Sequence, residues 1–139
     1  MKWLLALLLA AGCRESTGAL SAAQENRLAG ETIVRRADDL VFRYTRDPGG
    51  QREMREDRLA SIVVTTASLL IHKNAKVGVE ITPRSRRFYA ADRDGDRVRI
   101  RAGRGRSEEL WSFVPPSDAP GWVTDIRAVI QGTEAGAER

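Results

Sequence analysis

The sequence contains a single cysteine, Cys13, and a single histidine, His72, and both scarcities narrow the chemistry open to it. A structural zinc site takes about four Cys, His or carboxylate ligands. A serine or cysteine nucleophile needs a base within hydrogen-bond reach, and no spacing in the chain nominates such a set. We therefore expect a protein that is not an enzyme and that holds neither a metal nor a cofactor. We expect His72 to be a partly exposed strand residue.

The sequence also lacks a hydrophobic run long enough to cross a membrane. Its longest apolar stretch, Trp3 to Gly12, has ten residues, whereas a membrane-spanning helix needs about 20. Lys2 precedes this stretch, and the small residues Ala10, Ala11 and Gly12 end it directly before Cys13. A positive residue, a short apolar segment and small residues in this order are typical of an export signal.

This order resembles the lipobox of bacterial lipoproteins, in which the cysteine is acylated and the preceding peptide is removed. The resemblance implies that residues 1–12 are a cleaved signal peptide and that Cys13 carries the lipid, such as palmitate. That family most often has Leu three positions before the cysteine, where this chain has Ala10. Arg14 stands where an Asp typically retains lipoproteins at the inner membrane. A lipid-anchored envelope protein at the outer membrane, facing the periplasm, is therefore expected if the source has two membranes.

Lysine is scarce as well, and the basic character of the chain comes from arginine. The formal net charge is +4, and only Lys2, Lys73 and Lys76 are lysines. Nine arginines and three aspartates lie between Arg84 and Arg106. Alternation along one strand would aim several of these arginines outward as a face for phosphate groups on lipid or another envelope polyanion. The candidate residues are Arg84, Arg86, Arg87, Arg99, Arg101, Arg104 and Arg106. The alternative is a solvated strand face in an arginine-rich protein.

The remaining chain divides into a tether, one domain and a tail. Residues 14–30 are small and polar, and residues 13–38 are therefore expected to be a lipidated tether that is helical around Ser21 to Ala29. "ETIVRRADD", Glu31 to Asp39, is open to a helical turn or two. Residues 39–131 form the expected domain, and residues 132–139 a disordered tail.

Seven short segments of the domain have strand character. They are "LVFRYTR", "LASIVVTT", "ASLLIHKN", "KVGVEIT", the two halves of "RRFYAADRDGDRVRIRAG", and "ELWSFVPP". "DRDGDR" lacks the Gly and Glu positions of a calcium loop, and Asp94-Gly95 predicts a two-residue hairpin turn. That turn sets Ala91 opposite Val98 and Tyr89 opposite Ile100, all pointing inward.

A helix follows the strands. Ser117 or Asp118 can cap its N-terminus, Pro120 suits the first turn, and Gly132 suits its end. Trp122, Ile126 and Val129 recur at helical spacing and predict an apolar stripe.

Seven strands followed by one helix resemble the pleckstrin-homology superfold, particularly its bacterial and GRAM-like branches. "IVVTTASLLIHKN" is similar to the second–third strand hairpin of that family, and "LWSFVPPSDAPGW" to its last strand, linker and helix. The resemblance implies a mainly β fold: a partly open antiparallel barrel capped by the C-terminal helix. A cystatin-like or other helix-on-curved-sheet fold is the alternative.

The resemblance does not imply that this chain binds phosphoinositides. In that family a basic cluster follows the first strand, but here the arginines at 52, 55 and 58 are balanced by the acids at 53, 56 and 57. We expect a non-enzymatic binding module for a protein or an anionic envelope component, with no nucleic-acid partner. The alternative is a structural accessory in the assembly of an envelope membrane complex.

Overall fold

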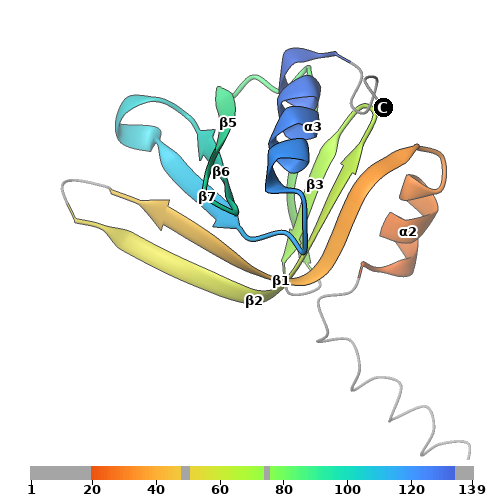
Figure 1. The fold of residues 1–139 in the computed structure, drawn as a ribbon, viewed down its shortest axis with the longest axis horizontal. Coiled ribbons are helices and arrows are strands. Elements are labelled where there is room, and N and C mark those ends of the chain that lie inside the picture. Colours follow the sequence, from red (N-terminus) through yellow and green to blue (C-terminus); the bar gives the residue numbers. More distant parts are fainter. Residues whose placement is uncertain (1–19, 48–50, 74–75, 134–139) are drawn as a thin grey trace, which may run out of the picture.

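The computed structural model describes residues 20–47, 51–73 and 76–133. Its elements in chain order are α2 (Ala22–Leu28), β1 (Ile33–Arg46), β2 (Glu53–Thr65), β3 (Leu69–Lys73), β4 (Lys76–Ile81), β5 (Tyr89–Asp94), β6 (Arg97–Ala102), the 3-10 turn η2 (Gly105–Ser107), β7 (Glu109–Phe113) and α3 (Ala119–Gln131). The strands form one antiparallel sheet of seven in the order β4-β3-β2-β1-β7-β6-β5. The sheet curls into a half-barrel, and α3 packs against it (Figure 1). This confirms the expected mainly β fold of seven strands capped by a helix.

Among the described residues, no helix combines the length and apolarity needed to cross a membrane.

Strand β1 is shared by the two halves of the curled sheet. It pairs with β2 along its length, and its last residues, Arg43–Arg46, also pair with β7 on the other side. Its register against β2 shifts between Ala37 and Leu40 and again between Leu40 and Phe42, and Asp39 has a φ of 56°. Such irregularities bend a strand and increase its local twist, which allows β1 to run from one half of the sheet into the other.

The core lies between the inner face of the sheet and α3. Ile62, Ile100 and Phe113 from the sheet and Ile126 from the helix are each 0% exposed. Phe113 meets the Trp122 ring edge-on, with centroids 5.5 Å apart. Burial of each such side chain stabilises the fold by about 1.5–3 kcal/mol. The predicted apolar stripe of the helix is confirmed, as are its cap at Asp118 and its end at Gly132.

Helix α2 covers the opposite, outer face of the sheet beside β1 (Figure 1). Ser21 caps it with a reciprocal pair of hydrogen bonds to Gln24. Leu28 is 1% exposed and Val63 of β2 is 0% exposed, yet neither belongs to the main core. Arg36 of β1 pairs with Glu25 at 2.6 Å and lowers the pKa of that carboxyl below its ordinary value. The expectation of a helix around Ser21 to Ala29 is confirmed.

Residues Glu31 to Asp39, which the sequence leaves open to a helical turn or two, instead contain the start of β1 at Ile33. The two-residue alternation was masked by adjacent charged residues and by the irregularity at Asp39. Arg35 faces α3 and Arg36 faces α2, since neighbouring strand residues point to opposite faces. Two adjacent arginines therefore form ion pairs on opposite faces of the sheet, Arg35 with α3 and Arg36 with α2.

The β5–β6 hairpin exists where expected, but its pairing is displaced by two residues. Ala91 lies opposite Ile100 and Tyr89 opposite Ala102, so the turn residues are Gly95 and Asp96 rather than Asp94 and Gly95. Gly95 has a φ of 61°, as the first central residue of a type II′ turn requires. Because a two-residue displacement preserves the side-chain alternation, Ala91 and Ile100 still point inward as predicted.

Candidate anion-binding groove

A groove of about 420 Å³ lies on the outer surface where the end of the β1–β2 hairpin meets β5, β6 and the β6–β7 connection. It is lined by Thr45, Arg46, Asp47, Arg52, Ala90, Ala91, Asp92, Arg99, Arg101, Gly105, Arg106, Glu108 and Leu110. Five arginines therefore face three carboxylates, and the charged side chains outnumber the apolar ones. A concave, cationic surface of this kind favours an anionic ligand.

Strand alternation explains how the arginines of β6 reach this surface. Val98, Ile100 and Ala102 are each 0% exposed and face the core. Arg99 and Arg101 lie between them and consequently point outward, as predicted. The pairing of β6 with β5 places Arg99 opposite Asp92 and Arg101 opposite Ala90.

Several of the predicted anion-binding arginines are already neutralised by carboxylates of the same surface. Arg99 binds Asp92 through two hydrogen bonds of 2.8 and 3.1 Å, which raise the pKa of its guanidinium. Arg101 pairs with Glu108 at 2.8 Å. These exposed pairs contribute little to stability, but they reduce the positive charge that the groove offers to a ligand.

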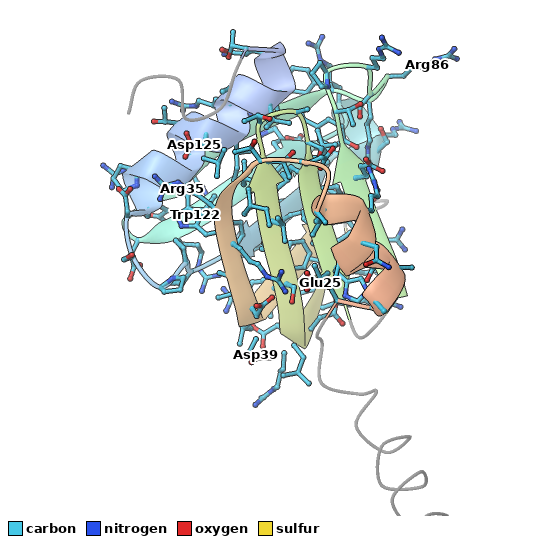
Figure 2. All side chains as sticks on the ribbon, turned by 90° about the vertical axis from the view of Figure 1, so that its right-hand side faces the viewer. Glu25, Arg35, Asp39, Arg86, Trp122 and Asp125 are labelled. Carbon is cyan, nitrogen blue, oxygen red and sulfur yellow. The ribbon has the colours of Figure 1, made fainter. Side chains whose placement is uncertain are left out.

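Two of the groove arginines, Arg52 and Arg106, have no carboxylate partner within the described part of the chain. Arg106 comes from η2, and Arg52 directly precedes β2. The remaining predicted residues lie outside the groove lining. Arg104 stacks on the Phe88 ring at 4.1 Å, and Arg84 and Arg86 are exposed in the β4–β5 connection, where Figure 2 shows Arg86 pointing away from the body. The structure thus brings Arg99, Arg101 and Arg106 together and leaves Arg84, Arg86, Arg87 and Arg104 outside.

Sequence reasoning missed the contribution of the β1–β2 hairpin, because a count of charges around Arg52 gives a balance near zero. In the structure Glu53 binds back to Arg46 at 2.7 Å, and Glu56 binds Arg43 at 3.0 Å. The alternating sequence of β2 contains the signal, since acids directly across a hairpin from arginines pair within it. Arg52 consequently keeps its charge available for the groove.

Arg87 belongs to a separate cluster around Glu109 at the start of β7. Its guanidinium lies 3.3 Å from Glu109, and Trp111 Nε1 donates to the same carboxylate at 3.1 Å. Burial acts to raise the pKa of Glu109, but hydrogen bonds from Arg87, Tyr44 and Trp111 outweigh it and lower that pKa. The pKa of Tyr44 is raised by burial and by its hydrogen bond to Glu109. The Glu109 carboxylate thus accepts hydrogen bonds from Arg87, Trp111 and Tyr44, and we interpret this cluster as one that stabilises the fold.

His72 is 2% exposed, so the expectation of a partly exposed residue is wrong. It lies opposite Ser61 on the outer face of β3, in a small cavity of about 50 Å³ shared with Leu20, Gln24 and Val79. Neither ring nitrogen has a hydrogen-bond partner among the residues that the structure describes. Gln24 and Arg27 of α2 also line this cavity, so the docking of α2 on this face contributes to the burial of His72.

No group of three or more His, Cys, Asp or Glu side chains capable of holding a metal occurs among residues 20–47, 51–73 and 76–133. The predicted lipid attachment site, Cys13, lies outside the described residues.

The fold and the groove together describe a PH-like half-barrel with a capping helix and a polar, arginine-lined outer surface. Comparison of the chain with protein-family models, with curated proteins and with solved structures finds no match.

Proposed function

We propose that this protein is a non-enzymatic binding module whose groove between the β1–β2 hairpin and the β6–β7 connection binds a phosphate-bearing component of the cell envelope. The observation that carries the proposal is the pair Arg52 and Arg106. Both line the groove, and neither has a carboxylate partner among the described residues. Arginine donates in a planar fork that suits phosphate oxygens.

The other groove arginines support this role without supplying free charge. Arg46, Arg99 and Arg101 are each held by a carboxylate, so their guanidinium planes have a defined orientation. An ordered arginine loses less side-chain entropy when it donates a further hydrogen bond. The proposed ligand is therefore bound by Arg52 and Arg106, which have no carboxylate partner in the described part of the chain, while the three paired arginines form a preorganised wall.

The lipobox-like segment supports a location at a membrane. An acyl chain on Cys13 would hold the domain beside the envelope, where phosphate-bearing headgroups are concentrated. One acyl chain gives only marginal membrane binding, and a second basic contact strengthens it. Anchor and groove would thus act on the same surface.

The groove is tested by titrating the purified full-length chain, in neutral detergent, with tripolyphosphate and with mixed micelles that contain phosphatidylglycerol or phosphatidylcholine. We expect the double variant Arg52→Glu, Arg106→Glu to weaken phosphate binding at least about tenfold, because two charge-assisted contacts are lost. Binding of both tripolyphosphate and phosphatidylglycerol indicates recognition of the phosphate group itself. Binding of phosphatidylglycerol alone indicates a lipid headgroup.

Arg93→Glu is the matched control. Arg93 is exposed at the end of the β5–β6 hairpin, donates to Gly95 of its own turn, and does not line the groove. Each substitution to Glu changes the net charge equally at its site, so the control separates groove binding from general attraction. If Arg93→Glu weakens binding as much as either groove substitution alone, or if the groove variant binds like the wild type, the proposal is wrong.

A further inference from the structure

Among the described strands, the first half of β2 has a neighbour on one side only. β2 spans Glu53–Thr65, but its pairing with β3 begins only at Ala60. Residues 53–57 pair with β1 on one side, and no described strand pairs with Glu53–Leu59 on the other. In Figure 1 this part of the hairpin extends away from β3 and α3, with β2 on its outer side. A long exposed edge is a template for another strand.

The side chains along this edge are accessible. Met54 is 60% exposed, the highest value among the exposed large hydrophobic residues of the described chain. Arginines and acids alternate around it, in the order Arg52, Glu53, Met54, Arg55, Glu56. Arg55 has no carboxylate partner in the described residues. Glu53 and Glu56 already bind arginines of β1, but a carboxylate can accept from a second donor.

The sequence of charged residues along this edge favours pairing with a second copy of the same strand in one register. When two copies of one strand pair antiparallel in a continuous sheet, opposed side chains lie on the same face of the sheet. The two-fold axis then passes midway between one residue and the same residue of the other copy, and we name each register by that residue. An axis at Arg55 opposes Arg55 to itself and Glu53 to Asp57. An axis at Glu56, Asp57 or Arg58 likewise sets the central charge against its own copy.

An axis at Met54 is different, because it opposes only favourable pairs. Met54 meets the Met54 of the other copy, Glu53 meets Arg55, and Arg52 meets Glu56. By symmetry each ion pair forms twice. Registers centred on Glu53 or on residues 55–58 all contain a central like-charge pair, so the edge encodes this register and disfavours its neighbours.

We infer that two copies of this chain join antiparallel through residues 52–56, with the two-fold axis at Met54, to form a sheet that continues across both molecules. The contact is isologous and closes on itself, so it produces a dimer and no fibre. It also covers the most exposed large apolar side chain among the residues described. The inference does not rest on the proposed anion-binding function. Arg52 contributes to both surfaces, and the tests below leave it unchanged.

The geometry is tested by disulfide trapping with the full-length chain in which Cys13→Ser removes the native thiol. Directly opposed strand residues have Cβ atoms about 4.5–5.5 Å apart, within reach of a disulfide after small adjustment. We expect Met54→Cys to give a cross-linked dimer under mild oxidation. Val41→Cys is the matched control, because Val41 is 47% exposed but belongs to β1, which is flanked by β2. Equal cross-linking of both variants, or cross-linking of Met54→Cys to a different protein in cells, would overturn the inference.

A charge exchange tests the register independently, by sedimentation equilibrium in neutral detergent. Glu53→Arg places like charges together twice and should raise the dimer dissociation constant about tenfold. The double variant Glu53→Arg, Arg55→Glu restores opposite charges and should recover most of the affinity. Arg46→Met removes the internal partner of Glu53 without touching the dimer contact, and should change the constant little. A wild-type chain that stays monomeric, or a double variant as weak as Glu53→Arg, contradicts the inference.

Discussion

Arg35 of β1 donates from Nε to Asp125 Oδ2 of α3 at 2.6 Å, joining the first strand of the chain to its last helix. The same guanidinium binds Asp118, which caps the helix, and lies 5.9 Å from the Trp122 ring centroid. Figure 2 shows the side chains of Arg35, Trp122 and Asp125 at the junction of strand and helix. Burial acts to lower the pKa of Arg35, but its bonds to Asp125 and Asp118 outweigh that effect and raise it. The half-barrel is therefore closed by a charged contact as well as by apolar packing.

Removing this contact should weaken the fold. The Arg35 and Asp125 side chains are 14% and 5% exposed, and the loss of one partner of a buried pair leaves the other charge uncompensated. We expect Arg35→Met to lower the free energy of unfolding by about 2–4 kcal/mol, measured by urea denaturation. Arg43→Met breaks the exposed pair with Glu56 and should cost no more than about 1 kcal/mol. If both variants lower the free energy of unfolding equally, the contact between Arg35 and α3 contributes no more to stability than an exposed ion pair.

Glu109 should make stability depend on acid pH. Its pKa is lowered from an ordinary value of 4.5. A lowered carboxyl pKa stabilises the fold above the unfolded-state value, and this contribution disappears as pH falls through the folded-state value. Glu109→Gln should therefore be less stable than the wild type by about 1–2 kcal/mol near neutral pH. The gap should narrow as pH falls below about 4.5. Thermal denaturation across this range measures it, and parallel curves would contradict the assignment.

The displaced hairpin turn predicts which glycine substitution is costly. Gly95 has a φ of 61°, and no positive φ occurs at Asp94 or Asp96. Gly95→Ala forces a side chain into a region that L-residues disfavour, and should cost about 1–2 kcal/mol in unfolding free energy. Asp94→Ala is the control, since Asp94 is a paired strand residue opposite Arg97. If Gly95→Ala costs no more than Asp94→Ala, Gly95 does not hold the positive φ that this turn requires.

The anchor can be tested apart from the domain. If Cys13 carries lipid, Cys13→Ser should leave the precursor unprocessed and should abolish labelling with a clickable palmitate analogue in cells. Cys13→Ala should behave identically, because neither side chain offers a thiol for acylation. A variant that is still processed and labelled normally would refute lipidation.

Local signals in the sequence predicted most of the fold. The hairpin around Gly95 and the helix with its Asp118 cap depend on neighbouring residues, so a single sequence displays them. The start of β1 at Ile33 could not be predicted, because the irregularity at Asp39 interrupts the alternation of apolar and polar residues. Strand prediction from a single sequence depends on that alternation. The hairpin register was displaced, because the Asp94-Gly95 pair and the Gly95-Asp96 pair are both acceptable turns locally.

The sequence by itself determined that strands precede a capped helix and that arginines alternate outward along β6. Only the tertiary structure decided which arginines keep their charge available. Arg99 and Arg101 lose it to Asp92 and Glu108, whereas Arg52 and Arg106 enter one groove from distant parts of the chain. The physical reason is that alternation depends on the strand itself, while neutralisation and burial depend on what packs across the sheet. The same holds for His72, which is buried in a cavity that α2 helps to line. It holds also for the first half of β2, with which no described strand pairs on the side of β3.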